Sequence, residues 1–168
     1  MKPITLIAES QIKDKIQELA GIISADYPDG LIAVGVLKGA FIFMADLVRA
    51  LRVPCNCDFV KVASYKGKES SGKISLELPP SLSVSEKKIL LVEDIVDTGL
   101  TISWLKDYFS KMGAEVKVCC LLDKPSRRKV DISPDYTGFA IEDYFVVGYG
   151  LDFNEEYRSL PYIGYLKE

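Results

Sequence analysis

The sequence predicts an α/β fold in which a mostly parallel central sheet is flanked by helices. Apolar runs of strand length recur along the chain, and segments with helical spacing separate them. The run from Ile89 to Val92 is apolar at every position, which is typical of a parallel strand covered on both faces. Strands that alternate with helices are joined by right-handed crossovers, and they place a ligand crevice at the carboxyl ends of the strands.

The expected elements follow one another without an internal repeat or a long low-complexity linker, so we expect one domain over residues 1–168. Ser10 is expected to cap a first helix that ends near Gly30. A second helix is expected at 41–51 and a third from Thr101 onward. Strands are expected at 31–37, 57–64, 74–78, 89–92, 115–122 and 145–149.

The most informative stretch covers residues 89–101. Adjacent Glu93 and Asp94 follow the apolar strand, and Asp97 begins a small turn of hydroxyl and glycine residues that opens a helix. A helix N-terminus presents unpaired N–H groups and positive dipole charge, and Gly99 lets a ligand approach the backbone. Any one of these acidic residues alone would be interpreted as a solvated loop residue. Together, the three carboxylates and the turn predict a site that holds a phosphate group.

Composition excludes several classes of function. The chain has no histidine, so any proton transfer depends on Asp, Glu, Lys or Tyr. A formal net charge of −3 argues against a protein that mainly coats nucleic acid. No stretch reaches the ~20 apolar residues that cross a bilayer, and no signal-like N-terminal segment is present, so we expect a cytoplasmic protein. The four cysteines are expected to be reduced core residues.

Two other classes of protein share parts of the motif. A phosphate-accepting receiver domain also has an acidic pair after a buried strand, but that pair lies near the start of its domain, and here too few residues follow. An aspartic protease uses Asp-Thr-Gly, as at residues 97–99, but in such enzymes that loop does not open an amphipathic helix. The one basic cluster, at 124–129, is local, and for its arginines a solvated loop is as good an interpretation as a binding role.

Residues 89–101 resemble the ribose-phosphate-binding signature of type I phosphoribosyltransferases, which hold the 5′-phosphate on the turn and the ribose hydroxyls near the acidic pair. The resemblance runs from about residue 31 to residue 158 and is nearest to the hypoxanthine-guanine branch of the family. Leu37, Lys38 and Gly39 are similar to the loop that binds pyrophosphate there. In that family the peptide before the lysine can be cis, so we predict a cis Leu37–Lys38 bond.

The polar segment 66–73 contains no apolar residue, which is typical of a mobile loop. With Ser64 and Tyr65 before it, this segment resembles the lid of the family, expected at about 65–75. A lid would keep water away from a cationic sugar in the transition state. On composition alone, a surface loop without that function is an equally good interpretation.

The C-terminal part resembles the purine-binding hood of the family, expected mainly at 123–168. Phe145 would stack on the base, and Val146 would offer backbone groups to its edge. Asp152 would face a second magnesium ion, and Arg158 matches an arginine that contacts pyrophosphate. Alone, Phe145 would be interpreted as a core residue and Asp152 as a solvated cap, but their order behind the acidic motif favours the binding roles.

Lys124 matches the family lysine that donates to O6 of the purine. An ammonium group has donors only, so it accepts a 6-oxopurine but leaves the 6-amino group of adenine facing another donor. An unsatisfied buried polar group costs about 1–3 kcal/mol, which is enough for about tenfold to hundredfold rejection. Because hypoxanthine, guanine and xanthine all keep O6, the sequence excludes adenine without ranking the other three.

The resemblance implies a magnesium-dependent reaction of purine salvage. Hypoxanthine or guanine would react with 5-phosphoribosyl 1-pyrophosphate to give IMP or GMP and pyrophosphate. Asp97 would accept the proton from N7 of the purine. Glu93 and Asp94 would hold the ribose hydroxyls, directly or through magnesium. The 5′-phosphate would be bound by Thr98, Gly99, Leu100 and Thr101, and the pyrophosphate by Lys38, Gly39 and Arg158.

The sequence leaves some features open. Several relatives carry lysine where this chain has Leu100, so a charge beside the phosphate is lost although the backbone amide is kept. The family commonly forms dimers and tetramers, which implies a homo-oligomer. A xanthine-preferring enzyme is an alternative, as is a nucleotide-responsive RNA-binding regulator on the same scaffold. Retention of Asp97, Lys124, Phe145, Asp152 and Arg158 favours the enzyme, without a nucleic acid or membrane partner.

Overall fold

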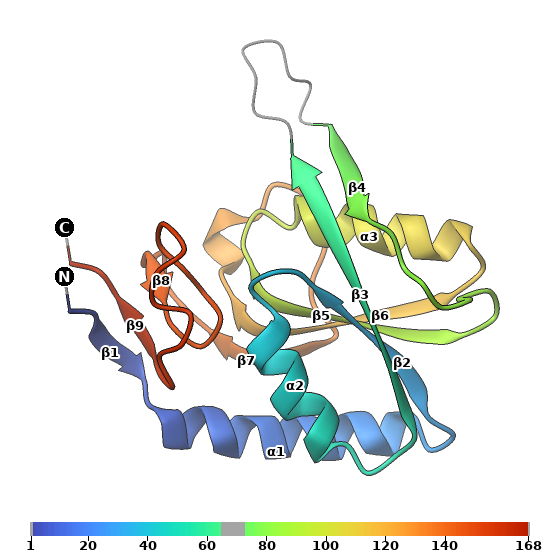
Figure 1. Ribbon diagram of the computed structural model, residues 1–168, viewed down its shortest axis with the longest axis horizontal. Helices are drawn as coiled ribbons and strands as arrows, with labels where there is room; N and C mark the ends of the chain where they lie inside the picture. The colour runs from blue at the N-terminus through green and yellow to red at the C-terminus, as the bar shows by residue number, and fades with distance from the viewer. Residues whose placement is uncertain (1, 65–72, 168) are drawn as a thin grey trace.

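A six-stranded sheet forms the centre of the protein. The computed structural model describes residues 2–64 and 73–167, so Tyr65 and most of the expected lid lie outside the described residues (Figure 1). The strand order is β4-β3-β2-β5-β6-β7, in which β4 runs antiparallel to β3 and the other neighbours are parallel. This arrangement confirms the predicted mostly parallel sheet. The strands are β2 (Leu31–Val36), β3 (Cys55–Ser64), β4 (Ile74–Leu78), β5 (Lys88–Val96), β6 (Glu115–Asp123) and β7 (Tyr136–Ala140).

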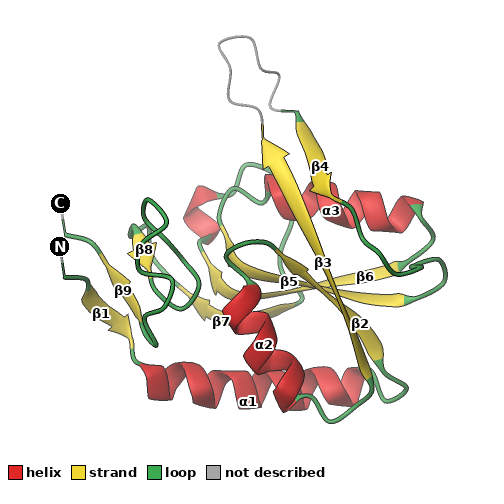
Figure 2. Cartoon of the chain, viewed as in Figure 1, coloured by secondary structure: helices red, strands yellow, loops and turns green. Residues whose placement is uncertain are grey.

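Helices cover both faces of this sheet, α1 (Glu9–Asp26) and α2 (Phe41–Ala50) on one face and α3 (Leu100–Lys111) on the other (Figure 2). Strand β5 shows why the apolar run has no polar position. Leu90 and Val92 belong to the apolar cluster that includes α1 and α2, whereas Ile89 and Leu91 belong to the cluster that includes α3. Successive side chains of a strand point to opposite faces, so a strand between two helical layers is apolar throughout.

A second, three-stranded antiparallel sheet carries the C-terminal part of the chain. Its order is β1-β9-β8, formed by β1 (Ile4–Ile7), β9 (Ile163–Tyr165) and β8 (Val146–Val147). The two ends of the described chain therefore lie side by side (Figure 1). This small sheet frames the predicted hood, and it includes a strand from the N-terminal end of the chain that the sequence did not reveal.

Some predicted boundaries are wrong. The first helix begins at Glu9, and Ser10 lies inside it rather than capping it; the Gln11 side chain accepts the N–H of Ala8 at 2.8 Å instead. The strand predicted at 145–149 is limited to β8, because Gly148 and Tyr149 have φ values of 99° and 52° and turn the chain away from an extended path. No helix among the described residues is long and apolar enough to cross a membrane.

Candidate active site

The predicted phosphate turn does open helix α3. Gly99 occupies the N-cap position with a φ of 83°, a left-handed conformation that favours glycine. A Cβ atom at this position would lie 2.7 Å from Cγ2 of Ile132, so the neighbouring chain also requires glycine. The turn and the acidic pair line one cavity of about 140 Å³. The cavity is bordered by Glu93, Asp94, Ile95, Val96, Asp97, Thr98, Gly99, Thr101 and Ile102.

Glu93 and Asp94, the acidic pair, are desolvated by the surrounding protein. Glu93 is 7% exposed, and its Oε1 accepts the N–H of Asp94 at 3.1 Å. Burial, and then the neighbouring Asp94 carboxylate, raise the pKa of Glu93 well above its usual value, and burial also raises the pKa of Asp94. Glu93 is buried and Asp94 is partly buried, and neither has a cation at hydrogen-bond distance among the described residues, so this environment favours a bound cation.

The donor set of this pair fits magnesium. Mg²⁺ prefers oxygen ligands, keeps several waters, and is usually held by one or two carboxylates together with substrate oxygens. Within the part of the chain that the structure describes, no three histidine, cysteine, aspartate or glutamate side chains gather into a complete metal cage. Glu93 and Asp94 would therefore share such an ion with a substrate rather than enclose it.

The Lys38-Gly39 loop lies directly against the acidic pair. The peptide bond between Leu37 and Lys38 is cis, as predicted. A Cβ atom on Gly39 would lie 1.8 Å from Oδ2 of Asp94, so a residue with a side chain cannot occupy this position without moving the carboxylate. The ammonium of Lys38 pairs with Oε2 of Glu155 at 3.0 Å. The loop thus joins the end of β2 to the acidic end of β5.

Arg158, near the end of the hood, contacts Glu155, the residue that also pairs with Lys38. Its Nη1 donates to the carbonyl oxygen of Gly150 at 2.7 Å, and its Nη2 pairs with Asp152 at 3.0 Å and with Glu155 at 3.3 Å. The Nε of Arg158 is buried and has no hydrogen-bond partner among the described residues. Asp152, predicted to face magnesium, is thus ion-paired to the arginine. Glu155 is a site residue that the sequence analysis missed.

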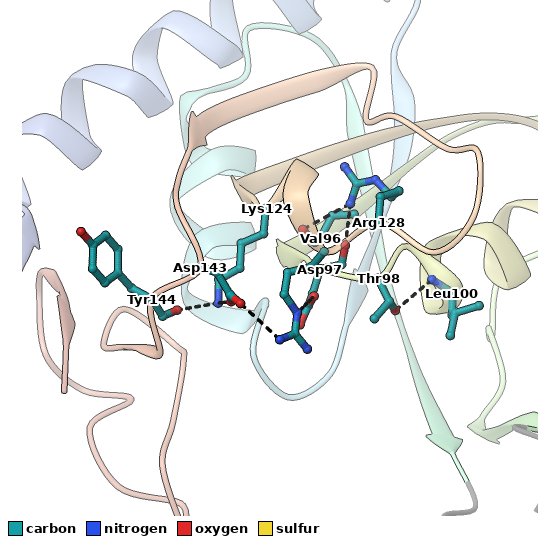
Figure 3. A network of polar contacts seen from close by, with 9 residues as sticks. Val96, Asp97, Thr98, Leu100, Lys124, Arg128, Asp143 and Tyr144 are labelled. Atoms are coloured by element: carbon teal, nitrogen blue, oxygen red, sulfur yellow. Dashed lines mark hydrogen bonds and ion pairs between the residues drawn. The ribbon is translucent and has the colours of Figure 1, made fainter. Parts of the chain in front are cut away.

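Asp97 is paired with an arginine that was only an ambiguous candidate in the sequence. Its Oδ1 accepts a hydrogen bond from Nε of Arg127 at 3.0 Å, and Nη1 of the same arginine lies 3.3 Å from Asp143. Asp143 in turn lies 3.4 Å from the ammonium of Lys124, and the two side chains point toward each other (Figure 3). A chain of alternating charges therefore links Asp97, the predicted general base, to Lys124, the lysine predicted to bind the purine.

Arg128 and Lys129 donate hydrogen bonds to the backbone carbonyl oxygens of the turn. Nη1 of Arg128 donates to the carbonyl oxygen of Asp97 at 2.8 Å (Figure 3). Its Nη2 pairs with Asp123 at the end of β6. The N–H of Lys129 also donates to the carbonyl oxygen of Thr98 at 2.9 Å. These contacts engage the carbonyl groups of the turn, whereas the first N–H groups of α3 have no partner within the helix. The basic cluster at 124–129 was the one sign of this support in the sequence.

Lys124 is a buried cation, 7% exposed, at the end of β6. Its ammonium donates to the carbonyl oxygen of Tyr144 in the hood. Phe145, by contrast, is 55% exposed and meets Phe153 edge to face at 5.5 Å, so it is not a core residue. An exposed aromatic ring near a buried lysine provides one stacking face and one donor for a flat ligand.

Val146 has backbone groups that are not used in the β8–β9 ladder. The N–H of Leu166 donates to the carbonyl oxygen of Phe145 at 3.2 Å, so these two residues form a hydrogen-bonded pair of the β8–β9 ladder. Such pairs alternate along an antiparallel ladder, and the N–H and C=O of Val146, opposite Tyr165, therefore point away from β9. Because β8 is the edge of its sheet as described, these groups point away from the sheet.

The structure brings most of the predicted residues together. The loop at 38–39, the motif at 93–101, Lys124 and the hood residues 145–158 come from three strand ends of the main sheet and from the hood. Ser64 is the last residue of β3. Leu100 is an exposed residue at the first position of α3, and its N–H lies 3.4 Å from Oγ1 of Thr98 (Figure 3).

Comparison with known proteins gives a consistent result. A model of the phosphoribosyl transferase domain matches residues 6–154. The hypoxanthine-guanine phosphoribosyltransferase of Bacillus subtilis is 47% identical over 165 residues, which are 96% of this chain and 92% of that protein. The protein of the same name from Aquifex aeolicus is 46% identical over 160 residues, 93% of this chain and 90% of that one.

A solved structure is similarly close. The crystal structure of a hypoxanthine-guanine phosphoribosyltransferase from Bacillus anthracis, with a HEPES molecule in the active site, is 42% identical, has a TM-score of 0.93 and covers 98% of each chain. Sequence, domain model and fold thus agree over nearly the whole chain. The chain belongs to the phosphoribosyltransferases, in the family of the hypoxanthine-guanine phosphoribosyltransferases.

Proposed function

We propose that the protein is a purine salvage enzyme that transfers the 5-phosphoribosyl group of 5-phosphoribosyl 1-pyrophosphate to N9 of hypoxanthine or guanine. The products are IMP or GMP and pyrophosphate. The observation that carries this proposal is the cavity lined by both a phosphate-sized helix turn and the acidic pair, with Gly39 packed directly against the Asp94 carboxylate. Residues 1–168 would act as one domain, with the hood and the lid as its parts.

The turn supplies the contacts for the 5′-phosphate. The N–H groups at the start of α3 and the hydroxyls of Thr98 and Thr101 border the cavity, and the helix dipole adds positive charge there. Leu100 contributes its amide but no charge, so the backbone provides most of the binding. Arg128 keeps the turn in place through the carbonyl oxygen of Asp97.

The acidic pair would hold the ribose. Glu93 and Asp94 line the same cavity as the phosphate turn. Their negative charge favours the positive charge that develops on the sugar as the pyrophosphate leaves. A magnesium ion held by this pair would supply Lewis acidity toward the hydroxyl and pyrophosphate oxygens.

The hood would select and orient the base. Phe145 supplies a stacking face, Val146 presents its N–H and C=O to the base edge, and Lys124 donates to O6. As N9 bonds to C1′ of the ribose and the bond from C1′ to the pyrophosphate oxygen breaks, N7 loses its proton to Asp97. Arg127, which pairs with Asp97 here, must release the carboxylate for that transfer.

The leaving group would be received by cations. Lys38 and Arg158 both pair with Glu155, Lys38 in the loop that lies against the acidic pair and Arg158 in the hood. Arginine and lysine neutralise phosphate oxygens through charge-assisted hydrogen bonds.

We also propose a homodimer or homotetramer that works in the cytoplasm, where all four cysteines would stay reduced; the structure contains them as free thiols.

A spectrophotometric assay tests this function. Each of hypoxanthine, guanine, xanthine and adenine is mixed with the purified protein, 5-phosphoribosyl 1-pyrophosphate and magnesium. We expect conversion of hypoxanthine, guanine or both, and rejection of adenine. Conversion of xanthine alone would favour the xanthine-preferring alternative. No conversion of any base, with a folded protein, would refute the proposed activity.

A further inference from the structure

Both cations assigned to pyrophosphate contact the same carboxylate. Oε2 of Glu155 lies 3.0 Å from Nζ of Lys38, and Oε1 lies 3.3 Å from Nη2 of Arg158. Lys38 comes from the loop after β2 and Arg158 from the hood, so Glu155 links two parts of the site that lie far apart in the sequence. A carboxylate that bridges two cations through two oxygens uses the donors that two oxygens of a phosphate group would use.

The turn that carries Glu155 directs its side chain to this place. Phe153 and Glu156 exchange two backbone hydrogen bonds, of 3.2 and 3.0 Å, and the two residues between them have φ values of 52° and 65°. Two central residues with positive φ form a type I′ turn, in which glycine is favoured at the second position. Glu155 occupies that position instead, and Oδ2 of Asp152 accepts its N–H at 2.9 Å.

Glu155 is an exposed partner for both cations. Its side chain is 64% exposed and that of Lys38 is 56% exposed, and an ion pair with such exposure contributes little net stability. The Arg158 side chain is 18% exposed and keeps a second partner, Asp152, at 3.0 Å. The hydrogen bond from Lys38, and then that from Arg158, hold the pKa of Glu155 below its usual value, so the carboxylate is ionised at neutral pH. A pyrophosphate group carries more negative charge and more acceptor oxygens than one carboxylate, and it would outcompete Glu155 for both cations.

We propose that Glu155 is an internal counter-anion that holds Lys38 and Arg158 in the ligand-free site and is displaced when pyrophosphate, or the pyrophosphate group of the donor, binds. This inference rests on the proposed function, because it takes those two cations as the pyrophosphate site. Glu155 lowers the affinity for the donor, because its contacts must be broken first. It also favours release of the product, because those contacts form again as pyrophosphate leaves.

Isothermal titration of inorganic pyrophosphate in the presence of magnesium tests this inference. Three proteins are compared: the wild type, Glu155→Gln and Glu156→Gln. The neighbouring Glu156 is exposed and forms no ion pair in the part of the chain that is described, so its replacement removes the same charge without touching Lys38 or Arg158. The Michaelis constant for 5-phosphoribosyl 1-pyrophosphate is measured for each protein in parallel.

We expect Glu155→Gln to bind pyrophosphate about threefold to tenfold more tightly than the wild type, with a matching fall in the Michaelis constant for the donor. Glu156→Gln is expected to shift both values by less than about twofold. Unchanged or weaker binding by Glu155→Gln, or an equal gain in Glu156→Gln, would overturn the inference and leave the proposed function intact. A wild type that does not bind pyrophosphate at all would overturn both.

Discussion

At the scale of single residues, four of the charges that would meet a substrate already have partners within the protein. Asp97 pairs with Arg127, and Lys124 donates to a hood carbonyl. Lys38 and Arg158 share Glu155. A substrate contact with any of these four would replace an existing one, and its net affinity depends on the difference between the two.

Asp97→Asn tests the proposed general base. An amide cannot take the proton from N7, and general-base assistance is typically worth about 10²–10⁴-fold, so kcat should fall by about that factor. The dissociation constant for IMP or GMP should change little, because the phosphate turn is kept. Steady-state kinetics and nucleotide titration measure both values. Asp107→Asn, an exposed change on α3, is the matched control. Loss of nucleotide binding by a folded Asp97→Asn protein would show a structural role instead.

Lys124→Gln tests the selection of the base. Glutamine can both donate and accept, so the 6-amino group of adenine finds an acceptor where the wild type has only donors. The ratio of kcat/KM for hypoxanthine to that for adenine should fall about tenfold to hundredfold. Lys129→Gln, an exposed change in the same loop, should leave the ratio as it is. An unchanged ratio in Lys124→Gln would contradict the assigned role.

At the scale of elements, Asp58 ties strand β3 to the loop that precedes β5. Its carboxylate accepts the N–H groups of Phe59, Ser81 and Leu82, each at 2.8 Å, and the hydroxyl of Ser81 at 3.0 Å. The side chain is 7% exposed. One buried carboxylate with four donors fixes where this loop leaves the sheet, and with it the path into β5.

Asp58→Ala should lower the free energy of unfolding by about 2–4 kcal/mol, because it leaves several buried donors without an acceptor. Burial alone would raise the pKa of Asp58, but its hydrogen bonds from Leu82, Phe59 and Ser81 outweigh burial and lower that pKa. A carboxylate whose pKa is lower in the folded state stabilises the fold above its unfolded pKa of about 3.9, and this contribution is lost as the pH falls through the folded value.

Denaturant unfolding between pH 7 and pH 3 measures this contribution. The difference in stability between the wild type and Asp58→Asn should be constant at neutral pH and should shrink below about pH 4. Asp14→Asn, on the exposed face of α1, provides the baseline for a solvated carboxylate. A difference that stays the same down to pH 3 would show that the hydrogen bonds of Asp58 do not depend on its charge.

The sequence predicts elements well where burial is complete and poorly where it is partial. Strand β5 contains four consecutive buried apolar residues, 89–92, and was predicted from that run. Strand β7 contains Gly138 and is half-buried at the edge of the sheet, and β1 and β9 are short strands that stabilise each other, so none of the three has a strong local pattern.

The same contrast holds within the site. The motif at 93–101 is contiguous, so its residues could be named from the sequence. Glu155 meets Lys38 across 117 positions of the chain, and Arg127 meets Asp97 across 30. Such pairs depend on how the hood packs against the sheet, and a single sequence carries no local signal for that packing. Resemblance to a family supplied the motif positions but not these counter-ions.

At the scale of the whole molecule, the site forms where the carboxyl ends of the main sheet meet the hood. The main sheet supplies the acidic pair, the phosphate turn and Lys124, and the hood supplies Phe145, Val146 and Arg158. Neither sheet contains a complete site. The fold therefore maintains an adjacent pair of carboxyl groups at this junction, although their desolvation destabilises the ligand-free protein.

Glu93→Gln tests whether this carboxyl group destabilises the ligand-free protein. Replacing a buried carboxylate by an amide removes its repulsion with Asp94, and we expect a gain of about 1 kcal/mol, or about 2–4 °C in Tm for a chain of this size. The same change should abolish most of the activity, because it weakens the contacts to the ribose and to magnesium. Differential scanning calorimetry without ligands gives the first value, with Glu156→Gln as the control. A lower Tm for Glu93→Gln would contradict this account of the pair.

The most direct test of the proposed site is a crystal structure of the protein soaked with GMP and magnesium. The phosphate should lie on the N–H groups of residues 98–101, with the ribose beside Glu93 and Asp94 and the purine between Phe145 and Lys124. Arg127 should have released Asp97 to the base. Density for the nucleotide at any other place, with the turn at 97–100 free of phosphate, would contradict the central claim.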